Sequence, residues 1–346
     1  MLIDFKNNID DNNLKTIVST IKNGGLVVFP TETVYGIGAD TFNIQAVKNI
    51  FVAKGRASDN PLIAHISSVD MLYRLTNKVP DIAKKLMSTF WPGPLTIVFD
   101  KVPNVPYEVT GGLETVAVRM PSNNIALSII AGADTPLVAP SANVSGKPSG
   151  TNVDDIYEEL KDKVDIIVDG GPTDVGIEST VVKIVDDTVI ILRPGKITRE
   201  DILALNIKCE LDSHIFHKVE ANEKVASPGM KYKHYAPDAK CIMVEGSSNS
   251  KVNKILELAG NETGSVLIIC VEENVAKYSD YQTLVMGKDG DYNSIAKNIF
   301  SCLRQANKIA PDLILLEGIE RSGIGMSIMN RMIRACAYNV IDADKD

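Results

Sequence analysis

The sequence predicts a two-domain α/β protein, and three observations support this prediction. The chain has 346 residues, which is longer than a domain with a single hydrophobic core usually is, so two domains are expected. In both halves, short strand-like apolar runs alternate with segments whose apolar residues recur at helical spacing. After about Ile207 this regular pattern weakens, and a region rich in turn formers follows. We therefore expect one domain at 1–207, a linker at 208–239 and a smaller domain at 240–346.

The composition is ordinary for a soluble globular protein, with 45% hydrophobic and 23% charged residues. A net charge of −8 counts against a broad nucleic-acid surface, but it leaves room for a local basic groove and for small anionic ligands. No apolar run approaches the ~20 residues of a membrane helix, and Met1–Asn13 lacks the apolar core of a signal peptide. The five cysteines form no Cys-x-x-Cys pair, which favours reduced thiols in a cytoplasmic protein.

The N-terminal elements frame two polar loops. A helix is predicted over residues 14–21, and the strand Leu26–Phe29 feeds the first loop, Thr31–Gly38. This loop offers hydroxyls and two glycines, which let the backbone turn tightly or approach a ligand closely. Asn43 is expected to cap the next helix, whose apolar face points to the core.

The second loop begins at the end of that helix and carries Lys54 and Arg56 on either side of a glycine. A compact ammonium beside a planar guanidinium suits a polyphosphate with several oxygens. A lone Lys-Gly-Arg is more often a solvated turn with two surface cations, so this motif needs support from the rest of the chain.

The next elements are a strand over Leu62–Ile66, which carries His65, and a helix near Asp81–Phe90. A histidine among apolar residues is more often a hydrogen-bonded core residue than a ligand contact. The following Trp-Pro-Gly-Pro forbids helix and makes a rigid corner, in which we expect Trp91 to give structural support.

Two further strands carry polar residues that suit a site. Thr115–Arg119 alternates as a half-buried strand does, so Thr115 and Arg119 share a face that suits a solvated edge or a bound ligand. The strand before Pro140 runs into a Ser/Asn/Gly loop, which supplies hydroxyls and backbone N–H groups for phosphate oxygens. This loop is not a Walker A motif, because Pro148 follows Lys147.

The first domain is expected to close with strands at Asp165–Asp169, after Gly176, and at Thr188–Arg193. Ser179 and Arg193 lie at strand ends, where ligand contacts are common. The C-terminal domain alternates strands and helices from Cys241 onward, which predicts a small, mostly parallel sheet. Its Gly-x-Gly turn lacks the third glycine of a dinucleotide fingerprint, so its expected role is to hold or gate the linker.

Taken together, these motifs resemble the YrdC-like domain of threonylcarbamoyl-AMP synthases. The resemblance rests on Thr31-Glu32-Thr33-Val34-Tyr35-Gly36, Lys54-Gly55-Arg56, Asn60-Pro61-Leu62, Pro140-Ser141-Ala142-Asn143 and Arg193-Pro194-Gly195. The stretch Ser227–Pro237 also matches the linker of the long form of the synthase. The implied fold is a twisted mixed sheet with helices around a concave groove, followed by a smaller Rossmann-like domain.

The resemblance implies a nucleotidyltransferase that converts ATP, L-threonine and bicarbonate to threonylcarbamoyl-AMP and pyrophosphate. Mg²⁺ would accompany the ATP, with no ligand assigned from protein side chains. The product would pass to the tRNA threonylcarbamoyl-transferase machinery, with at most a weak contact to tRNA and none to a membrane.

The same resemblance assigns individual residues. Lys54 and Arg56 are expected to be catalytic. The L-threonine pocket would be formed by Thr33, His65, Arg119, Ala139 and Ser179. The ATP contacts would be Arg56, Asn60, Thr115, Ser141, Asn143, Ser149, Arg193 and Tyr235. Tyr235 lies in the linker, which would act either as a lid that orders on binding or as a permanently ordered strap.

Two other functions use the same residues. In an RNA-binding module, Lys54, Arg56, Lys147 and Arg193 would contact phosphates, but the negative net charge and the polar pocket residues count against it. A carbamoyl-phosphate-handling maturation factor shares the YrdC-like domain, but such proteins usually carry acylphosphatase and zinc-finger regions that this chain lacks.

Overall fold

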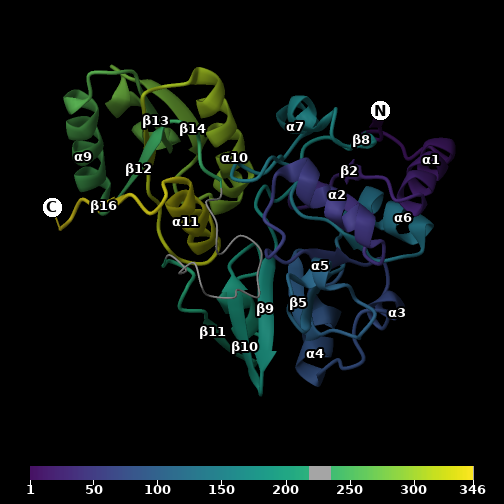
Figure 1. Cartoon of the computed structure of the whole chain (residues 1–346). Helices are drawn as coiled ribbons and strands as arrows, with labels where there is room; N and C mark the ends of the chain where they lie inside the picture. Colours follow the sequence, from purple (N-terminus) through teal and green to yellow (C-terminus); the bar gives the residue numbers. More distant parts are fainter. Residues whose placement is uncertain (218–234, 346) are drawn as a thin grey trace. The chain divides into compact units, whose positions relative to one another are not determined.

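The computed structural model describes residues 1–217 and 235–345, which Figure 1 shows in colour. The chain divides into two compact units, Met1–Ser145 with Ser149–Lys231, and Gly146–Pro148 with Tyr232–Asp346. Most of the predicted linker, including residues 227–234 of the expected lid, lies outside the described residues.

Among the described residues, the first unit contains a mixed sheet of eleven strands in the order β1-β8-β2-β3-β7-β4-β6-β5-β9-β10-β11. The strands are β1 (Leu2–Asp4), β2 (Val27–Phe29), β3 (Gly36–Asp40), β4 (Ile63–His65), β5 (Leu95–Asp100), β6 (Thr115–Arg119), β7 (Leu137–Val138), β8 (Ile166–Asp169), β9 (Thr180–Val185), β10 (Thr188–Arg193) and β11 (Lys208–Leu211). Parallel and antiparallel pairs occur side by side, since β4 pairs in parallel with β6 and antiparallel with β7. This arrangement confirms the predicted mixed sheet.

Most helices of the first unit begin at a side chain that caps their first turn. Asn43 accepts a hydrogen bond from the Ala46 amide at 3.0 Å, as predicted, and Gly55 ends the same helix in the left-handed region at φ 60°. The helices are α1 (Asp11–Lys22), α2 (Ile44–Lys54), α3 (Val69–Leu72), α4 (Asp81–Phe90), α5 (Tyr107–Thr110), α6 (Asn124–Ala133), α7 (Val153–Leu160) and α8 (Arg199–Leu203). Lys54 is therefore the last residue of α2, and Arg56 follows its C-cap.

The register of three neighbouring strands brings polar residues into one row. Arg119 ends β6 and is paired with His65 of β4 on one side and with Thr96 of β5 on the other. Residues that are paired directly across neighbouring strands lie on the same face of a sheet, so these three side chains share one. The predicted corner supports this row, because the Trp91 indole is buried and donates to the Leu95 carbonyl at 2.7 Å.

The second unit contains, within its described part, a parallel sheet in the order β14-β13-β15-β12-β16. Its elements are β12 (Lys240–Glu245), α9 (Ser248–Asn261), β13 (Val266–Val271), η1 (Glu272–Tyr278), β14 (Gln282–Gly287), α10 (Tyr292–Ile309), β15 (Leu313–Glu317), α11 (Ile324–Ala335) and β16 (Val340–Asp342). The parallel sheet is the one that the strand–helix alternation predicts.

The structure departs from the sequence-based boundaries at two points, and one of them is that Gly146–Pro148 belongs to the second unit and not to the first domain. Residues 208–211 were assigned to the linker, whereas they form β11 and pair in parallel with β10. Only one side chain of this short strand, Cys209, is buried, so the apolar residues of β11 are too few to predict a strand from the sequence. No helix in the described ranges is both long and apolar enough to cross a membrane.

Candidate active site

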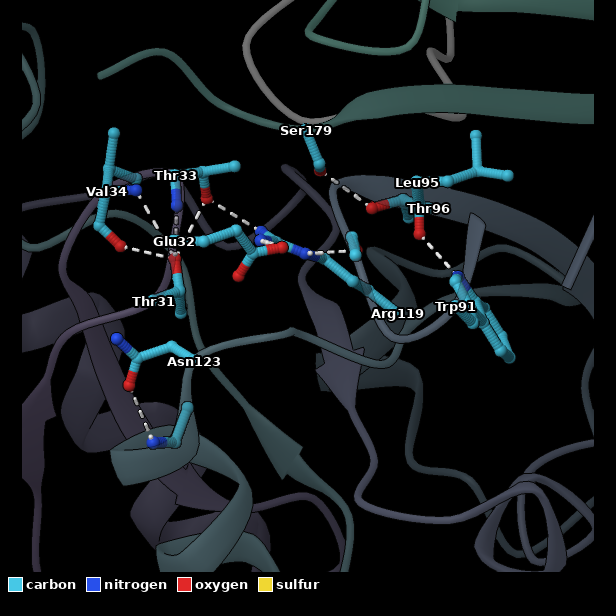
Figure 2. A network of polar contacts seen from close by, with 12 residues as sticks. Thr31, Glu32, Thr33, Val34, Trp91, Leu95, Thr96, Arg119, Asn123 and Ser179 are labelled. Atoms are coloured by element: carbon cyan, nitrogen blue, oxygen red, sulfur yellow. Dashed lines mark hydrogen bonds and ion pairs between the residues drawn. The ribbon is translucent and has the colours of Figure 1, made fainter. Parts of the chain in front are cut away.

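A buried arginine lies at the centre of the predicted threonine pocket. Arg119 is 4% exposed, and its Nη1 donates to the Thr33 hydroxyl at 2.8 Å. Its Nε donates to the Gly93 carbonyl at 3.3 Å, and its Nη2 lies 2.7 Å from Oε1 of Glu32. Figure 2 shows the guanidinium beside Thr33 and Glu32, facing the first polar loop. The arginine and the threonine hydroxyl predicted to bind one substrate are thus in contact.

The loop that presents Thr33 is fixed by hydrogen bonds. The Thr31 hydroxyl donates to the Val34 carbonyl at 2.7 Å and lies 2.9 Å from the Thr33 hydroxyl. The amides of Val175 and Gly176 donate to the carbonyls of Glu32 and Thr33 at 2.8 and 3.1 Å. The loop therefore holds its side chains in place before any ligand binds.

His65 is buried beside Arg119, and its Nδ1 lies 3.1 Å from the Ile63 carbonyl. Burial, with the positive charge of Arg119 as the second cause, lowers the pKa of His65 from 6.5 to about 3. The imidazole is neutral at physiological pH, so it can take part in a pocket as a hydrogen-bonding group but not as a cation.

This shift predicts an acid-labile fold. A histidine whose folded pKa lies below its unfolded pKa contributes stability that is complete above pH 6.5 and decreases as the pH falls toward 3. Between pH 7 and pH 5, wild type should lose about 2 kcal/mol more unfolding free energy than His65→Asn. Denaturant titrations at both pH values measure this difference, and equal losses in the two proteins would contradict the assignment.

The remaining pocket residues connect to a predicted nucleotide contact. The hydroxyls of Ser179 and Thr96 lie 2.8 Å apart, and Arg193 Nη2 donates to the Ser179 carbonyl at 3.0 Å. Ala139 lies beside Ile63, to whose carbonyl its amide donates at 3.1 Å. Ser179 and Arg193, assigned to different substrates, are therefore in direct contact.

Lys54 holds the Ser-Ala-Asn loop. Its buried Nζ donates to the Asn143 carbonyl at 2.8 Å, to the Asn143 Oδ1 at 3.4 Å and to the Ser141 carbonyl at a shorter distance. The Ser141 hydroxyl donates to the Asn143 Oδ1 at 2.6 Å. The structure thus brings the predicted catalytic lysine together with two predicted nucleotide contacts, and its ammonium is directed at protein carbonyls.

Arg56 and Asn60 lie in the loop after α2, where Arg56 Nη2 donates to the Pro61 carbonyl at 3.1 Å. Thr115 begins β6 and Arg119 ends it, so the two Cα atoms are ~13 Å apart along the strand. The turn before β6 runs beside the Asn60 loop, since Gly111 closely approaches the backbone of Asp59. Thr115 therefore lies at the end of β6 opposite to Arg119, and its contact with ATP stays a prediction.

Ser149 and Tyr235 complete the predicted nucleotide contacts. The Ser149 hydroxyl donates to Oε1 of Glu178 at 2.6 Å, and Glu178 precedes Ser179 in the chain. Tyr235 belongs to the second unit, where its ring stacks on Phe300 with 5.0 Å between centroids. Its contact with ATP stays a prediction.

Sequence reasoning missed two buried carboxylates, Glu32 and Glu178. Each is 5–6% exposed and contacts an assigned site residue. The signal was available for Glu32, because it lies inside the hydroxyl-rich motif and a carboxylate is rarely buried without a partner. No cluster of three or more His, Cys, Asp or Glu side chains suited to a metal occurs in the part of the chain that is described.

The fold and the site define a two-domain α/β protein in which charged and hydroxyl-bearing side chains are buried together at the ends of the strands. The family is then shown by comparison with known proteins. A family model described as "Telomere recombination", covering Sua5, YciO and YrdC proteins, matches residues 19–195. The model "Threonylcarbamoyl-AMP synthase, C-terminal domain" matches residues 197–337. The chain belongs to the Sua5/YrdC family of threonylcarbamoyl-AMP synthases.

Full-length relatives agree with this assignment. The chain is 40% identical to the threonylcarbamoyl-AMP synthase of Pyrococcus abyssi, over 99% of both proteins. It is 41% identical to the Bacillus subtilis enzyme, over 96% of this chain and 95% of that one. The crystal structure of P. abyssi Sua5 complexed with L-threonine matches with a TM-score of 0.92 and 40% identity, covering 99% of each chain.

Proposed function

We propose that this chain makes threonylcarbamoyl-AMP and pyrophosphate from L-threonine, bicarbonate and ATP, as the first step of threonylcarbamoyladenosine formation on tRNA. The observation that carries this proposal is the buried hydrogen bond between Arg119 and Thr33, in a chain similar throughout to a structure that holds L-threonine. A guanidinium fork and a hydroxyl suit the carboxylate and hydroxyl of threonine.

The chemistry has two bond-forming steps. The amine of threonine attacks the carbon of bicarbonate to give a carbamate and water. A carbamate oxygen then attacks the α-phosphorus of ATP, and pyrophosphate leaves. Both steps need alignment and charge neutralisation rather than a covalent enzyme intermediate. Arg56 and Arg193 supply cations for the phosphates, and Lys54 fixes the loop of Ser141 and Asn143 beneath them.

The remaining partners belong to the same proposal. Mg²⁺ would bind through the phosphates of ATP and offset part of their charge. The adenylate would pass to the tRNA threonylcarbamoyl-transferase machinery, with at most a weak contact to tRNA. A cytoplasmic location is supported by five buried cysteines, all free thiols, although the sulfurs of Cys241 and Cys336 lie 2.9 Å apart.

Pyrophosphate release from ATP, measured with and without L-threonine and bicarbonate, tests this function. Release should require both, and mass spectrometry should detect the threonylcarbamoyl adenylate. Release that is independent of threonine would reject the proposal. RNA binding with a steep salt dependence, and no pyrophosphate, would instead support the RNA-binding alternative.

Arg56→Ala is expected to weaken ATP binding by about 10- to 100-fold, because a charge-assisted contact to a phosphate is lost. Threonine affinity should change by less than about threefold, since Arg56 contacts the Asn60 loop and not the Arg119 pocket. Calorimetry with each ligand measures both effects. The matched control is Lys48→Ala, which replaces an exposed lysine of α2, the helix that precedes the Arg56 loop, and it should change neither. Unchanged ATP binding in Arg56→Ala would remove its phosphate role.

A further inference from the structure

Glu32 is a buried carboxylate whose partners are incomplete. Its Oε1 lies 2.7 Å from Arg119 Nη2, and the two side chains are 6% and 4% exposed. This contact is not aligned for a hydrogen bond. Among the described residues, neither oxygen of Glu32 nor the Arg119 Nη2 has a hydrogen-bond partner. A buried charge is costly unless it is both paired with an opposite charge and hydrogen-bonded. Glu32 and Arg119 neutralise each other, but the Glu32 carboxylate and the Arg119 Nη2 lack hydrogen bonds within the described part of the chain.

The position of Glu32 is imposed by the fold. Its backbone carbonyl accepts from the Val175 amide at 2.8 Å, and the hydroxyls of the neighbouring residues Thr31 and Thr33 are hydrogen-bonded to each other. Arg119 is fixed independently by the Thr33 hydroxyl and the Gly93 carbonyl. Figure 2 shows both charged groups converging from different elements on the same place. A carboxylate and a guanidinium are thus held side by side, each with hydrogen-bonding capacity left over.

A zwitterion fits this arrangement. In an α-amino acid the ammonium and the carboxylate are joined to one carbon, so they require an acceptor and a donor next to each other. The carboxylate of the ligand can accept from Arg119, and the ammonium supplies three donors to Glu32. The ion pair between Glu32 and Arg119 is then replaced by two ion pairs with the ligand, and the net charge of the site does not change.

We propose that Glu32 binds the α-ammonium group of the amino-acid substrate and makes the pocket selective for zwitterionic amino acids. This proposal rests on the proposed function, which places L-threonine at Arg119. Both charged groups are covered in this structure, so entry of the amino acid requires a local opening.

The experiment compares two ligands that differ only in the group that Glu32 would contact. L-threonine carries an ammonium, and the 2,3-dihydroxybutanoate of matching configuration carries a hydroxyl in its place. Wild type should bind threonine about 10- to 100-fold more tightly, as expected for a charge-assisted contact. Glu32→Gln should weaken threonine binding by about this factor and leave the analogue within about threefold, so that the preference disappears.

Asp40→Asn is the matched control, since Asp40 is a partly buried carboxylate of the same unit that accepts from the Thr135 hydroxyl and the Phe42 amide. It should keep the preference for threonine. Glu32→Asp retains the negative charge and should still prefer threonine to the analogue, although by a smaller factor. A purely structural role of Glu32 would not predict any dependence of this preference on the charge. If Glu32→Gln does not fold, wild type and Glu32→Asp still test the proposal: equal binding of the two ligands by either protein overturns it.

The outcomes also separate this inference from the function. Failure of wild type to bind L-threonine rejects the proposed function. Tight threonine binding with an unchanged preference in Glu32→Gln rejects the role of Glu32 alone.

Discussion

Replacing Lys54 with methionine is expected to lower the rate of adenylate formation by at least about 100-fold, through loss of the nucleotide loop. Its ammonium is buried and donates to the carbonyls of Ser141 and Asn143 and to the Asn143 side chain. Methionine fills a similar volume but offers no donor. Each orphaned buried carbonyl costs about 1–3 kcal/mol, so the loop should rearrange. A loss of about 2.7 kcal/mol of transition-state stabilisation gives the 100-fold change.

Steady-state kinetics with ATP varied, together with thermal unfolding, measures this effect. Lys48→Met is the matched control, because Lys48 lies on the same helix and is exposed. It should retain wild-type activity. A Lys54→Met enzyme that keeps both its ATP dependence and its turnover would show that neither the loop contacts nor the charge of Lys54 matters.

The start of α2 could be predicted from the sequence, because it depends on local chemistry, whereas its last residue, Lys54, was assigned to the second loop. The Asn43 side chain caps the first turn of α2 by accepting a hydrogen bond from a backbone amide. Gly55 ends the helix in the left-handed region, which glycine adopts easily because it has no side chain. Strands β12, β13 and β15 of the second unit were similarly clear, since apolar runs alternate with helical segments there, whereas β14 and β16 were not predicted. In both cases the information lies within a few residues of the feature.

The order of the strands and the partners of the charged residues could not be predicted in this way. The pairing of His65, Arg119 and Thr96 depends on which strands become neighbours, and this order is set by the whole sheet. The resemblance implies that Lys54 is a catalytic cation, whereas in the structure its ammonium is directed at carbonyls of its own chain. Glu32 could be suspected from its place in the hydroxyl-rich motif, but its partner could not be predicted, because Arg119 lies 87 positions away.

The same pairing leads to the second large effect. Arg119→Met is expected to abolish measurable threonine binding, with an affinity loss of at least about 100-fold, because the substrate carboxylate loses its bidentate partner. It should also lower the unfolding free energy by about 3–5 kcal/mol, since Glu32 would remain buried without a counter-charge. ATP binding should be largely retained, because the Lys54 and Arg56 contacts lie on other elements.

A double variant separates the two effects. Arg119→Met combined with Glu32→Gln removes both charges, and replacing a buried ion pair by neutral groups is often close to neutral in stability. The double variant should therefore regain most of the unfolding free energy that Arg119→Met loses, while threonine binding stays absent. Denaturant unfolding and threonine calorimetry on wild type, both single variants and the double variant complete the cycle. Additive stability losses would mean that Glu32 and Arg119 are not coupled, and threonine binding by the double variant would place the amino acid elsewhere.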